Sequence, residues 1–197
     1  MPTFNRAGYL EKAVQSVLSQ SFGNWELIIV DDGSSDNTFE TLEPFIARFP
    51  NIRYMKHKNR KAALSRNAGI QASFGRYITF LDSDDHYLEN HLESRMEIIE
   101  TMPDVDLLCG GYHCDENMMV KDCKNPDRLI HVRECIVGGT FFGRRELFIA
   151  LEGYRDLDYA EDTDLWERAS ERFTLKKIEE PKTYVYEHSD DSTTLNY

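Results

Sequence analysis

Two spacings of apolar residues alternate along the first hundred positions of this chain. Apolar residues that recur every three or four positions predict amphipathic helices, and short continuous apolar runs predict buried strands. The expected helices are 7–20, a segment carrying Leu42, Phe45, Ile46 and Phe49, then 62–74 and 91–101. The expected strands are 25–30, 52–55, 77–81 and 105–109. Asn5 stands before the first helix as a possible cap.

This alternation predicts an α/β fold with a mostly parallel sheet, because the gaps between the strands are long enough for helical crossovers. The second half is less regular. It predicts an irregular polar loop over 113–128, helices over 144–151 and 161–172, and two short edge strands within 174–187. The polar tail 189–197 is expected to be mobile. With no internal repeat or linker, residues 1–197 are expected to form one domain.

The N-terminus departs from this pattern. The segment 2–6 has the character of a loop that follows a first strand, yet only Met1 precedes it. Two interpretations remain open: the true N-terminus lies upstream, or the fold tolerates an incomplete central strand. The second would expose hydrogen-bonding groups of the backbone at a cost in stability.

Composition and charge indicate a folded protein that does not bind nucleic acid. Hydrophobic residues make up 41% and aromatic residues 12% of the chain, which is too much for a disordered protein. The net charge of −12 would repel nucleic-acid phosphates. No apolar run approaches the roughly 18 residues needed to span a bilayer. We therefore expect a cytoplasmic protein with reduced cysteines, possible peripheral association at the inner face of a membrane, and Cys109 packed in the core.

Carboxylates follow the expected strand 77–81, in the segment Asp82-Ser83-Asp84-Asp85. Residues two apart in an extended segment point to the same side, so Asp82 and Asp84 can present their oxygens together at the carboxyl edge of the sheet. A hard divalent cation such as Mg²⁺ or Mn²⁺ prefers such oxygens. The alternative for the same residues is an acidic turn that caps the next helix.

Five segments in order resemble the motifs of the family 2 glycosyltransferases, inverting enzymes of the GT-A fold. They are Pro2-Thr3-Phe4-Asn5-Arg6, Asp31-Asp32-Gly33-Ser34, Arg66-Asn67, Asp82-Ser83-Asp84-Asp85 and Glu161-Asp162. The resemblance extends from residue 2 to about residue 188. It implies a Rossmann-like, mostly parallel sheet flanked by helices, with a nucleotide-sugar half over about 1–110 and an irregular acceptor and base half over about 111–190.

The resemblance implies a nucleoside-diphosphate sugar as donor, with a UDP-sugar as the expected one. The residues implied in binding it are Thr3, Phe4, Asn5, Asp32, Arg66, Asp82, Ser83 and Gly139. Phe4 would stack on the base, which is worth roughly 1–3 kcal/mol, and Asp32 would accept a hydrogen bond from a base N–H. A core phenylalanine, a capping aspartate and a solvated arginine are the alternatives for Phe4, Asp32 and Arg66. Lys61 stands where the family commonly has a glycine.

The implied metal ligands for Mn²⁺ or Mg²⁺ are Asp84, Asp82 and His188, of which Asp84 would bind the ion directly. For His188 the alternative is an exposed histidine near a frayed end. The implied catalytic pair is Asp162, the general base that takes the proton of the acceptor hydroxyl, and Glu161 as its support. A helix N-terminus lowers the pKa of a carboxyl group, so Asp162 is expected to be ionised. Its alternative role is to cap that helix.

The resemblance therefore implies a metal-dependent inverting glycosyltransferase, of the hexosyltransferase type in EC 2.4. It would move a sugar to a hydroxyl of a glycan or glycolipid acceptor in polysaccharide biosynthesis. The alternative is a catalytically incomplete GT-A-fold domain that binds nucleotide and needs a partner chain or a first strand. A nucleotidyltransferase is a third reading, but the segment 2–6 lacks the glycine-rich phosphate loop that it requires.

Overall fold

The computed structural model describes residues 1–125 and 127–187, and its first half follows the hydrophobic pattern closely. The helices are α1 (Ala7–Leu18), α2 (Thr38–Arg48), α3 (Lys61–Ala72) and α4 (His91–Thr101). The strands are β1 (Pro2–Thr3), β2 (Leu27–Asp31), β3 (Ile52–Lys56) and β4 (Tyr77–Thr79). Two expectations about this half are wrong. The strand expected over 77–81 ends at Thr79, and residues 83–84 form a turn rather than the extended segment expected for Asp82 and Asp84. Asn5 does not cap α1, because its side chain accepts a hydrogen bond from the Ser35 N–H at 2.8 Å instead.

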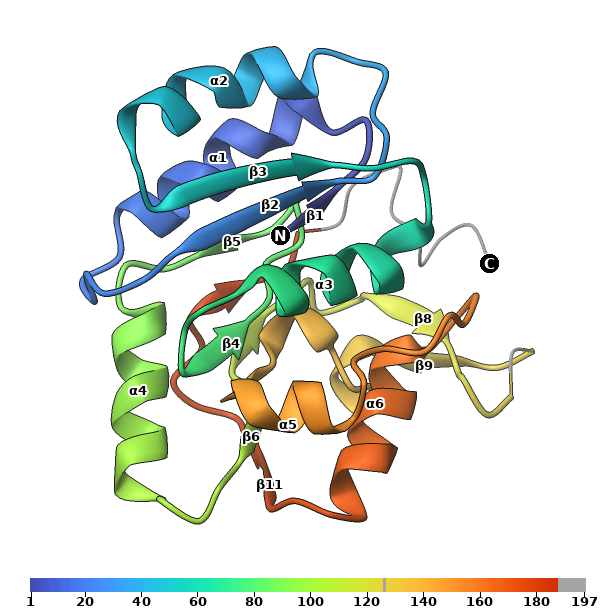
Figure 1. Ribbon diagram of the computed structural model, residues 1–197. Helices are drawn as coiled ribbons and strands as arrows, with labels where there is room; N and C mark the ends of the chain where they lie inside the picture. The colour runs from blue at the N-terminus through green and yellow to red at the C-terminus, as the bar shows by residue number, and fades with distance from the viewer. Residues whose placement is uncertain (126, 188–197) are drawn as a thin grey trace.

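Two sheets carry the fold. The first has the order β1-β2-β3 and is parallel throughout, with Pro2 opposite Val30 and Leu27 opposite Ile52. Figure 1 shows α1 and α2 on one side of this sheet and α3 on the other. The expected α/β fold with a parallel sheet flanked by helices is thus confirmed.

The second sheet has the order β11-β6-β10-β4 and is mixed. Its further strands are β6 (Leu107–Gly110), β10 (Phe142–Arg144) and β11 (Leu175–Ile178). β11 runs parallel to β6, whereas β10 runs antiparallel to both β4 and β6. The chain enters β10 through a short 3₁₀ turn, η2 (Gly138–Thr140), rather than through a helical crossover, so an antiparallel pairing is available to it.

The remaining elements surround this second sheet. Helices α5 (Arg145–Ala150) and α6 (Glu161–Ser170) lie close to their expected places. The strands β5 (His86–Tyr87), β12 (Tyr184–Val185) and β7 (Tyr112–His113) form a small sheet in that order. A second 3₁₀ turn, η1, spans Val132–Glu134. The expected mobile tail, like His188, lies outside the described residues.

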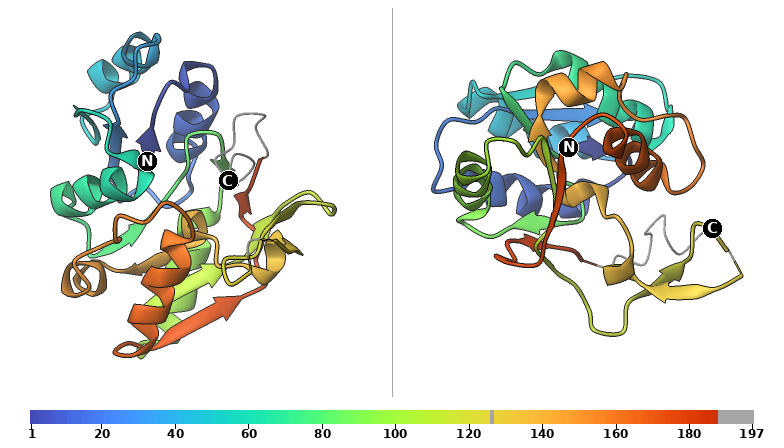
Figure 2. Two further views of the ribbon diagram at one scale, coloured as in Figure 1. Left: turned by 90° about the vertical axis from the view of Figure 1, so that its right-hand side faces the viewer. Right: turned by 90° about the horizontal axis from the view of Figure 1, so that it is seen from below.

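The segment 113–128 is more ordered than its polar composition predicts. β8 (Met119–Lys121) pairs antiparallel with β9 (Leu129–His131), and Figure 2 shows the two strands projecting from the second half. Met118 and Val120 are buried in a small cluster with Val132 and Val137, while Met119 between them is exposed. This alternation is the signature of a half-buried strand. The expectation of an irregular loop is therefore wrong for this part.

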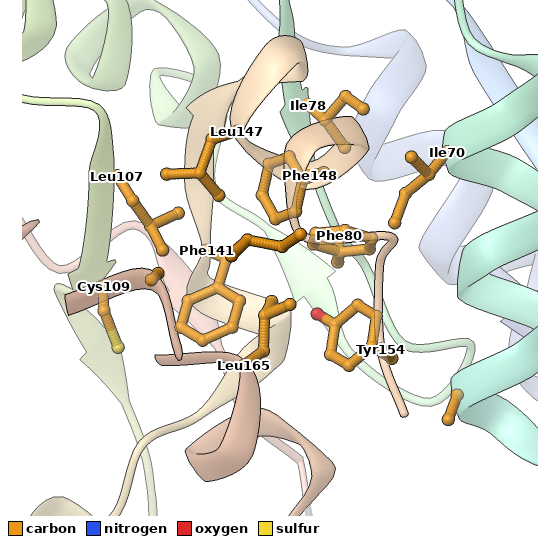
Figure 3. Close-up of a cluster of buried hydrophobic side chains, with 13 residues drawn as sticks. Ile70, Ile78, Phe80, Leu107, Cys109, Phe141, Leu147, Phe148, Tyr154 and Leu165 are labelled. Atoms are coloured by element: carbon orange, nitrogen blue, oxygen red, sulfur yellow. The ribbon is translucent and has the colours of Figure 1, made fainter. Parts of the chain in front are cut away.

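One core cluster joins the aspartate-bearing strand segment to α6. Figure 3 shows Phe80 packed edge-on against Phe148 and Tyr154, with Phe141 and Leu165 beside them. Cys109 belongs to this cluster, as expected, and all four cysteines are free. Because Phe80 precedes Asp82 and Leu165 follows Asp162, the cluster fixes the two acidic motifs relative to each other. Among the described residues, no helix has the length and apolar character needed to cross a membrane.

Candidate active site

A cleft of about 890 Å³ lies beyond the carboxyl ends of β1, β2 and β4, the edge at which open α/β sheets bind ligands. Ten of the residues expected from the sequence line it. They are Thr3, Phe4, Asp32, Arg66, Asp82, Ser83, Asp84, Gly139, Glu161 and Asp162. Asn5 is not part of the lining, and His188 lies outside the described residues. The cleft thus brings together motifs from both halves of the chain.

Arg66 of α3 links the two acidic motifs. Its Nη2 donates to Asp82 Oδ1 at 2.8 Å and its Nη1 donates to Glu161 Oε1 at 2.9 Å. The guanidinium lies over the ring of Tyr154, 5.5 Å from its centroid. Burial alone would lower the pKa of Arg66, but the charges of Asp82 and Asp162 outweigh it and hold that pKa above its usual value. Arg66 is therefore a buried cation that orients carboxylates on opposite walls of the cleft.

Asp162 lies in the first turn of α6 without capping it, since the N-cap position is Ala160. Its Oδ2 accepts a hydrogen bond from the Gly138 N–H at 3.0 Å, and its buried Oδ1 has no hydrogen-bond partner among the described residues. Burial raises its pKa to about 7; the charge of Arg66 opposes this shift, and those of Glu161 and Asp82 add to it. The expectation that the helix N-terminus lowers the pKa of Asp162 is therefore wrong, because loss of water has the larger effect.

The glycine pair of η2 permits this contact. A Cβ atom at Gly138 would overlap the Asp162 carboxylate, and one at Gly139 would overlap the hydroxyl of Tyr184. Both positions therefore require glycine for close approach rather than for an unusual backbone angle. Gly138, which precedes the expected binding residue Gly139, is the residue whose N–H holds the expected base.

Replacing Gly138 by alanine is expected to lower the turnover rate by at least about tenfold, because a displaced carboxylate accepts the proton less well. Affinity for UDP, the nucleotide that the resemblance implies, should stay within about twofold when measured by calorimetry, since a Cβ at Gly138 meets Asp162 rather than Phe4 or Asp32. Gly8→Ala is the matched control, because a Cβ at Gly8 of α1 meets nothing within 4 Å. Equal turnover for the two variants would contradict the assigned role of Gly138.

The three carboxylates of the segment 82–85 have two different roles. Asp85 is buried: the Tyr184 hydroxyl donates to its Oδ2, and the Glu187 N–H donates to its Oδ1 at 2.8 Å. Burial and the nearby charge of Asp82 raise the pKa of Asp85 to about 8. Asp82 and Asp84 keep partly exposed side chains at the cleft, with Asp84 Oδ2 3.9 Å from Arg6 Nη2. Asp85 anchors the loop, and the other two face the ligand space.

The two aspartates at the end of β2, Asp31 within the strand and Asp32 just after it, also have different roles. Asp31 accepts hydrogen bonds from the Tyr54 hydroxyl at 2.6 Å and from the Ser34 N–H at 2.7 Å, so it stabilises the turn. Asp32 Oδ1 accepts from the Arg60 N–H at 2.7 Å, and the residue lines the cleft. Phe4, 45% exposed, lies on the same cleft and offers a ring face to a planar ligand.

The donor set at Asp82 and Asp84 fits a divalent cation of the Mg²⁺ or Mn²⁺ type. Such ions are commonly held by one or two carboxylates, with water and substrate phosphates completing the shell. Across residues 1–125 and 127–187 there is no group of three or more His, Cys, Asp or Glu side chains that could hold a metal. A cation here would therefore depend on phosphate oxygens as well as on these two residues.

Tyr184 is the main contributor that sequence reasoning missed. Its hydroxyl donates a hydrogen bond to Asp85 and lies directly against Gly139, so it connects two loops of the cleft. The sequence identified only a short edge strand around it. A glycine pair before a strand is a signal for close approach of another group, but it does not identify that group.

Comparison with known proteins identifies the family of the chain. The model of the family described as "Glycosyl transferase family 2" matches residues 1–149. The chain is 33% identical over 144 residues to the Escherichia coli protein named UDP-Glc:alpha-D-GlcNAc-diphosphoundecaprenol beta-1,3-glucosyltransferase WfgD, covering 70% of this chain and 55% of that protein. It is 36% identical over 114 residues to the glycosyltransferase GlyG of Streptococcus pneumoniae, covering 57% of this chain and 38% of that protein.

Solved structures show the same fold. S. aureus TarS 1-349 in complex with UDP-GlcNAc matches with a TM-score of 0.80 and 17% identity, covering all of this chain and 59% of that one. The mannosyltransferase PcManGT from Pyrobaculum calidifontis, in complex with GDP-Man and Mn²⁺, matches with a TM-score of 0.75 and 17% identity, covering 98% of this chain and 56% of that one. The chain thus spans only about two fifths to three fifths of the length of these relatives, and on the family match it belongs to glycosyl transferase family 2.

Proposed function

We propose that this domain transfers a sugar, with inversion, from a nucleoside-diphosphate sugar to a hydroxyl of a glycan or glycolipid acceptor. The observation that carries the proposal is the position of Asp162: a half-buried carboxylate on the same cleft as Asp82 and Asp84, whose buried Oδ1 has no hydrogen-bond partner among the described residues. A UDP-sugar is the proposed donor, since the name of WfgD specifies UDP-Glc and TarS was solved with UDP-GlcNAc.

The donor half of the cleft would hold the nucleotide. Phe4 stacks on the base, Asp32 accepts a hydrogen bond from it, and Thr3 and Ser83 line the path to the phosphates. Asp84 and Asp82 would hold a Mn²⁺ or Mg²⁺ ion, and His188 remains a proposed third ligand. When bound, such an ion neutralises negative charge on the departing diphosphate. Arg66 keeps Asp82 in place by the 2.8 Å hydrogen bond.

The acceptor half would supply the proton acceptor. As the acceptor oxygen forms its bond to the anomeric carbon, the bond from that carbon to the diphosphate oxygen breaks, and its electron pair leaves with the nucleotide. The acceptor proton passes to the Asp162 carboxylate, whose Oδ2 is held by the Gly138 N–H. Glu161, held by Arg66, supports the orientation of this site.

Turnover is expected to rise with pH through about 7 and to level off above it, because Asp162 acts only when ionised and its pKa is raised to about 7. The measurement is kcat/KM from pH 5.5 to 8.5 at constant free Mn²⁺. In Glu161→Gln the rise should move to lower pH, since the charge of Glu161 contributes to the raised pKa of Asp162. A flat profile in the unmodified protein would exclude Asp162 as the base.

The function is tested by incubating the purified protein with Mn²⁺, a glycolipid acceptor mixture, and UDP-glucose, UDP-GlcNAc or GDP-mannose in turn. Release of nucleoside diphosphate above the acceptor-free rate supports the proposal. UDP and Mn²⁺ binding by calorimetry with no release, and no effect of Asp162→Asn in any assay, would favour the alternative of an incomplete nucleotide-binding domain.

The acceptor name of WfgD includes diphosphoundecaprenol, a lipid carrier. We propose by analogy that the acceptor of this domain is presented at a membrane surface, and that the protein works as a cytoplasmic, peripherally associated enzyme of polysaccharide biosynthesis. Sedimentation with vesicles that carry a polyprenyl diphosphate, compared with vesicles that lack it, tests this location.

A further inference from the structure

His57 lies beside Asp32, the residue proposed to accept a hydrogen bond from the nucleotide base. It directly follows β3, and its backbone N–H donates to the Asp31 carbonyl at 3.0 Å. This bond continues the pairing of β3 with β2 by one residue, so the imidazole comes to lie next to the carboxylate that follows β2. His57 is half-buried and is not among the described residues that line the cleft. Any effect of its side chain on a ligand would therefore act through Asp32.

The contacts of the imidazole show which ring nitrogen carries a hydrogen. Nδ1 lies 2.9 Å from the Lys58 carbonyl oxygen and 3.2 Å from Asp32 Oδ1. A carbonyl oxygen and an ionised carboxylate can only accept hydrogen bonds, so Nδ1 is an N–H whether or not the other nitrogen is protonated. That other nitrogen, Nε2, lies 3.5 Å from Ser65 Oγ of α3. His57 therefore presents a fixed N–H donor to Asp32.

The two oxygens of Asp32 differ in their surroundings. Oδ1 accepts a hydrogen bond from the Arg60 N–H at 2.7 Å, and the His57 N–H approaches the same oxygen. Within residues 1–125 and 127–187, no donor is bound to Oδ2. Asp32 is buried apart from the surface that it contributes to the cleft. The protein therefore holds one oxygen and leaves the other for a ligand.

The backbone of the loop 57–60 is placed by contacts other than the imidazole. Gly33 has a φ of +89°, and a Cβ atom there would lie only 3.1 Å from the Asn59 nitrogen and 3.2 Å from the His57 carbonyl oxygen. This close approach, together with the backbone bonds from His57 and Arg60, fixes the loop against the end of β2. The side chain of His57 is thus available for a separate role in orienting the carboxylate.

We propose that His57 is a positioning residue that sets the base preference of the cleft through Asp32. With Oδ1 held by Arg60 and His57, one oxygen remains to accept a hydrogen bond. Uracil matches a single acceptor, because it offers one N–H, at N3, between two carbonyl groups. Cytosine has a lone pair at N3, which an anionic oxygen repels. The inference rests on the proposed function, since it requires that Asp32 meets the base of the donor.

The imidazole would act by preorganising the carboxylate. Without the Nδ1 hydrogen, the Asp32 carboxylate keeps only the bond from Arg60 and can turn about its terminal torsion. Oδ2 would then be in position to accept from the N3–H of uracil for a smaller share of the time, and the ordering of the carboxylate would oppose binding. A cytosine nucleotide has no such N–H to lose, so its affinity should not depend on His57.

The test compares His57→Asn with His57→Leu, two side chains that branch at the same atom. The amide of asparagine can place an N–H where Nδ1 lies, whereas leucine places a methyl group there. We expect His57→Leu to lower the affinity for UDP by at least about fivefold and the affinity for CDP by less than about twofold. His57→Asn should keep the preference for UDP within about twofold of the unmodified protein.

Calorimetry with UDP and with CDP, at pH 8 and a fixed concentration of Mn²⁺, measures both affinities. The control is His113→Gln, which changes an exposed histidine of β7 and should leave both affinities unchanged. If His57→Leu does not fold, His57→Gln replaces it, because the glutamine amide reaches the position of Nε2 rather than that of Nδ1. In a turnover assay the loss should appear in the KM for a UDP-sugar and not in kcat, since His57 does not contact the reacting atoms.

Equal preferences for UDP over CDP in His57→Leu and in the unmodified protein would overturn the proposal. An asparagine variant as impaired as the leucine variant would also overturn it, because ring packing rather than the N–H would then matter. An equal loss of affinity for both nucleotides would limit His57 to holding its loop. If the unmodified protein binds UDP without transferring sugar, the proposed activity fails while this binding test still applies. If the unmodified protein binds neither nucleotide, the proposed donor and this inference fail together.

Discussion

Asp162→Asn is expected to lower turnover by about 10²–10⁴-fold, the range typical of losing a general base. The amide keeps the shape of the side chain and can still accept the Gly138 N–H, but it cannot take a proton. Affinity for UDP, measured without acceptor, should be unchanged, because the nucleotide half of the cleft does not use this residue. Nucleotide release and calorimetry on the same preparation separate these two effects.

The same substitution is expected to stabilise the protein at pH 8. The pKa of Asp162 is about 7 in the folded protein, above the roughly 3.9 of an unfolded chain. The folded state therefore holds its proton more tightly, and this stabilising contribution is complete below about pH 4 and lost as the pH rises to about 7. At pH 8 the native protein buries a charge that asparagine does not carry. We expect a gain of about 1–3 kcal/mol at pH 8 and almost none at pH 4.

Urea unfolding at the two pH values measures this difference. Asp164→Asn is the matched control, since Asp164 lies in the same helix but accepts hydrogen bonds from Arg168 at 2.7 Å and Arg155 at 3.0 Å. Losing those ion pairs should cost stability rather than add it. If Asp162→Asn instead lowered the free energy of unfolding at pH 8, the charged Asp162 carboxylate would not destabilise the native protein.

The sequence could predict the parts of the cleft but not how they are joined. Periodicity located α3, and the motif order selected Arg66, Asp82 and Glu161 as site residues. It could not show that one guanidinium bridges the other two, because that contact depends on how α3 and α6 pack around the cluster of Phe80 and Leu165. Local patterns report on neighbours along the chain, whereas Arg66 and Glu161 are 95 residues apart in the sequence.

The wrong expectation for Asp162 has the same origin. A helix N-terminus is visible in the sequence, and its favourable effect on a carboxylate is worth only about 0.3–1 kcal/mol at an exposed site. Burial is not visible, and it has the larger effect here.

Arg66→Met is expected to lower the free energy of unfolding by about 3–5 kcal/mol at pH 8, the range for removing one partner of a buried ion pair. Methionine fills much of the volume but leaves Asp82 and Glu161 without the cation that bridges them. Arg66→Lys should lose less, because it keeps the charge but cannot donate to two carboxylates in the geometry of a guanidinium. Urea unfolding of the unmodified protein, Arg66→Lys and Arg66→Met at pH 8 measures the order of their free energies of unfolding.

The double variant Arg66→Met with Asp162→Asn tests whether the two sites act as one unit. The charge of Arg66 opposes the raised pKa of Asp162, so removing it should raise that pKa further and move the pH dependence of turnover to higher pH. With asparagine at 162, one of the carboxylates that Arg66→Met leaves without a nearby cation is absent. Arg66→Met should therefore lower the free energy of unfolding by about 0.5–3 kcal/mol less than it does in the unmodified protein. Strictly additive losses would mean that Arg66 holds Asp82 and Glu161 without influencing the base. A non-additive result would place Asp162, Arg66 and the carboxylates that Arg66 bridges in one electrostatic network, in which burial raises the pKa of Asp162 and the charge of Arg66 opposes that rise.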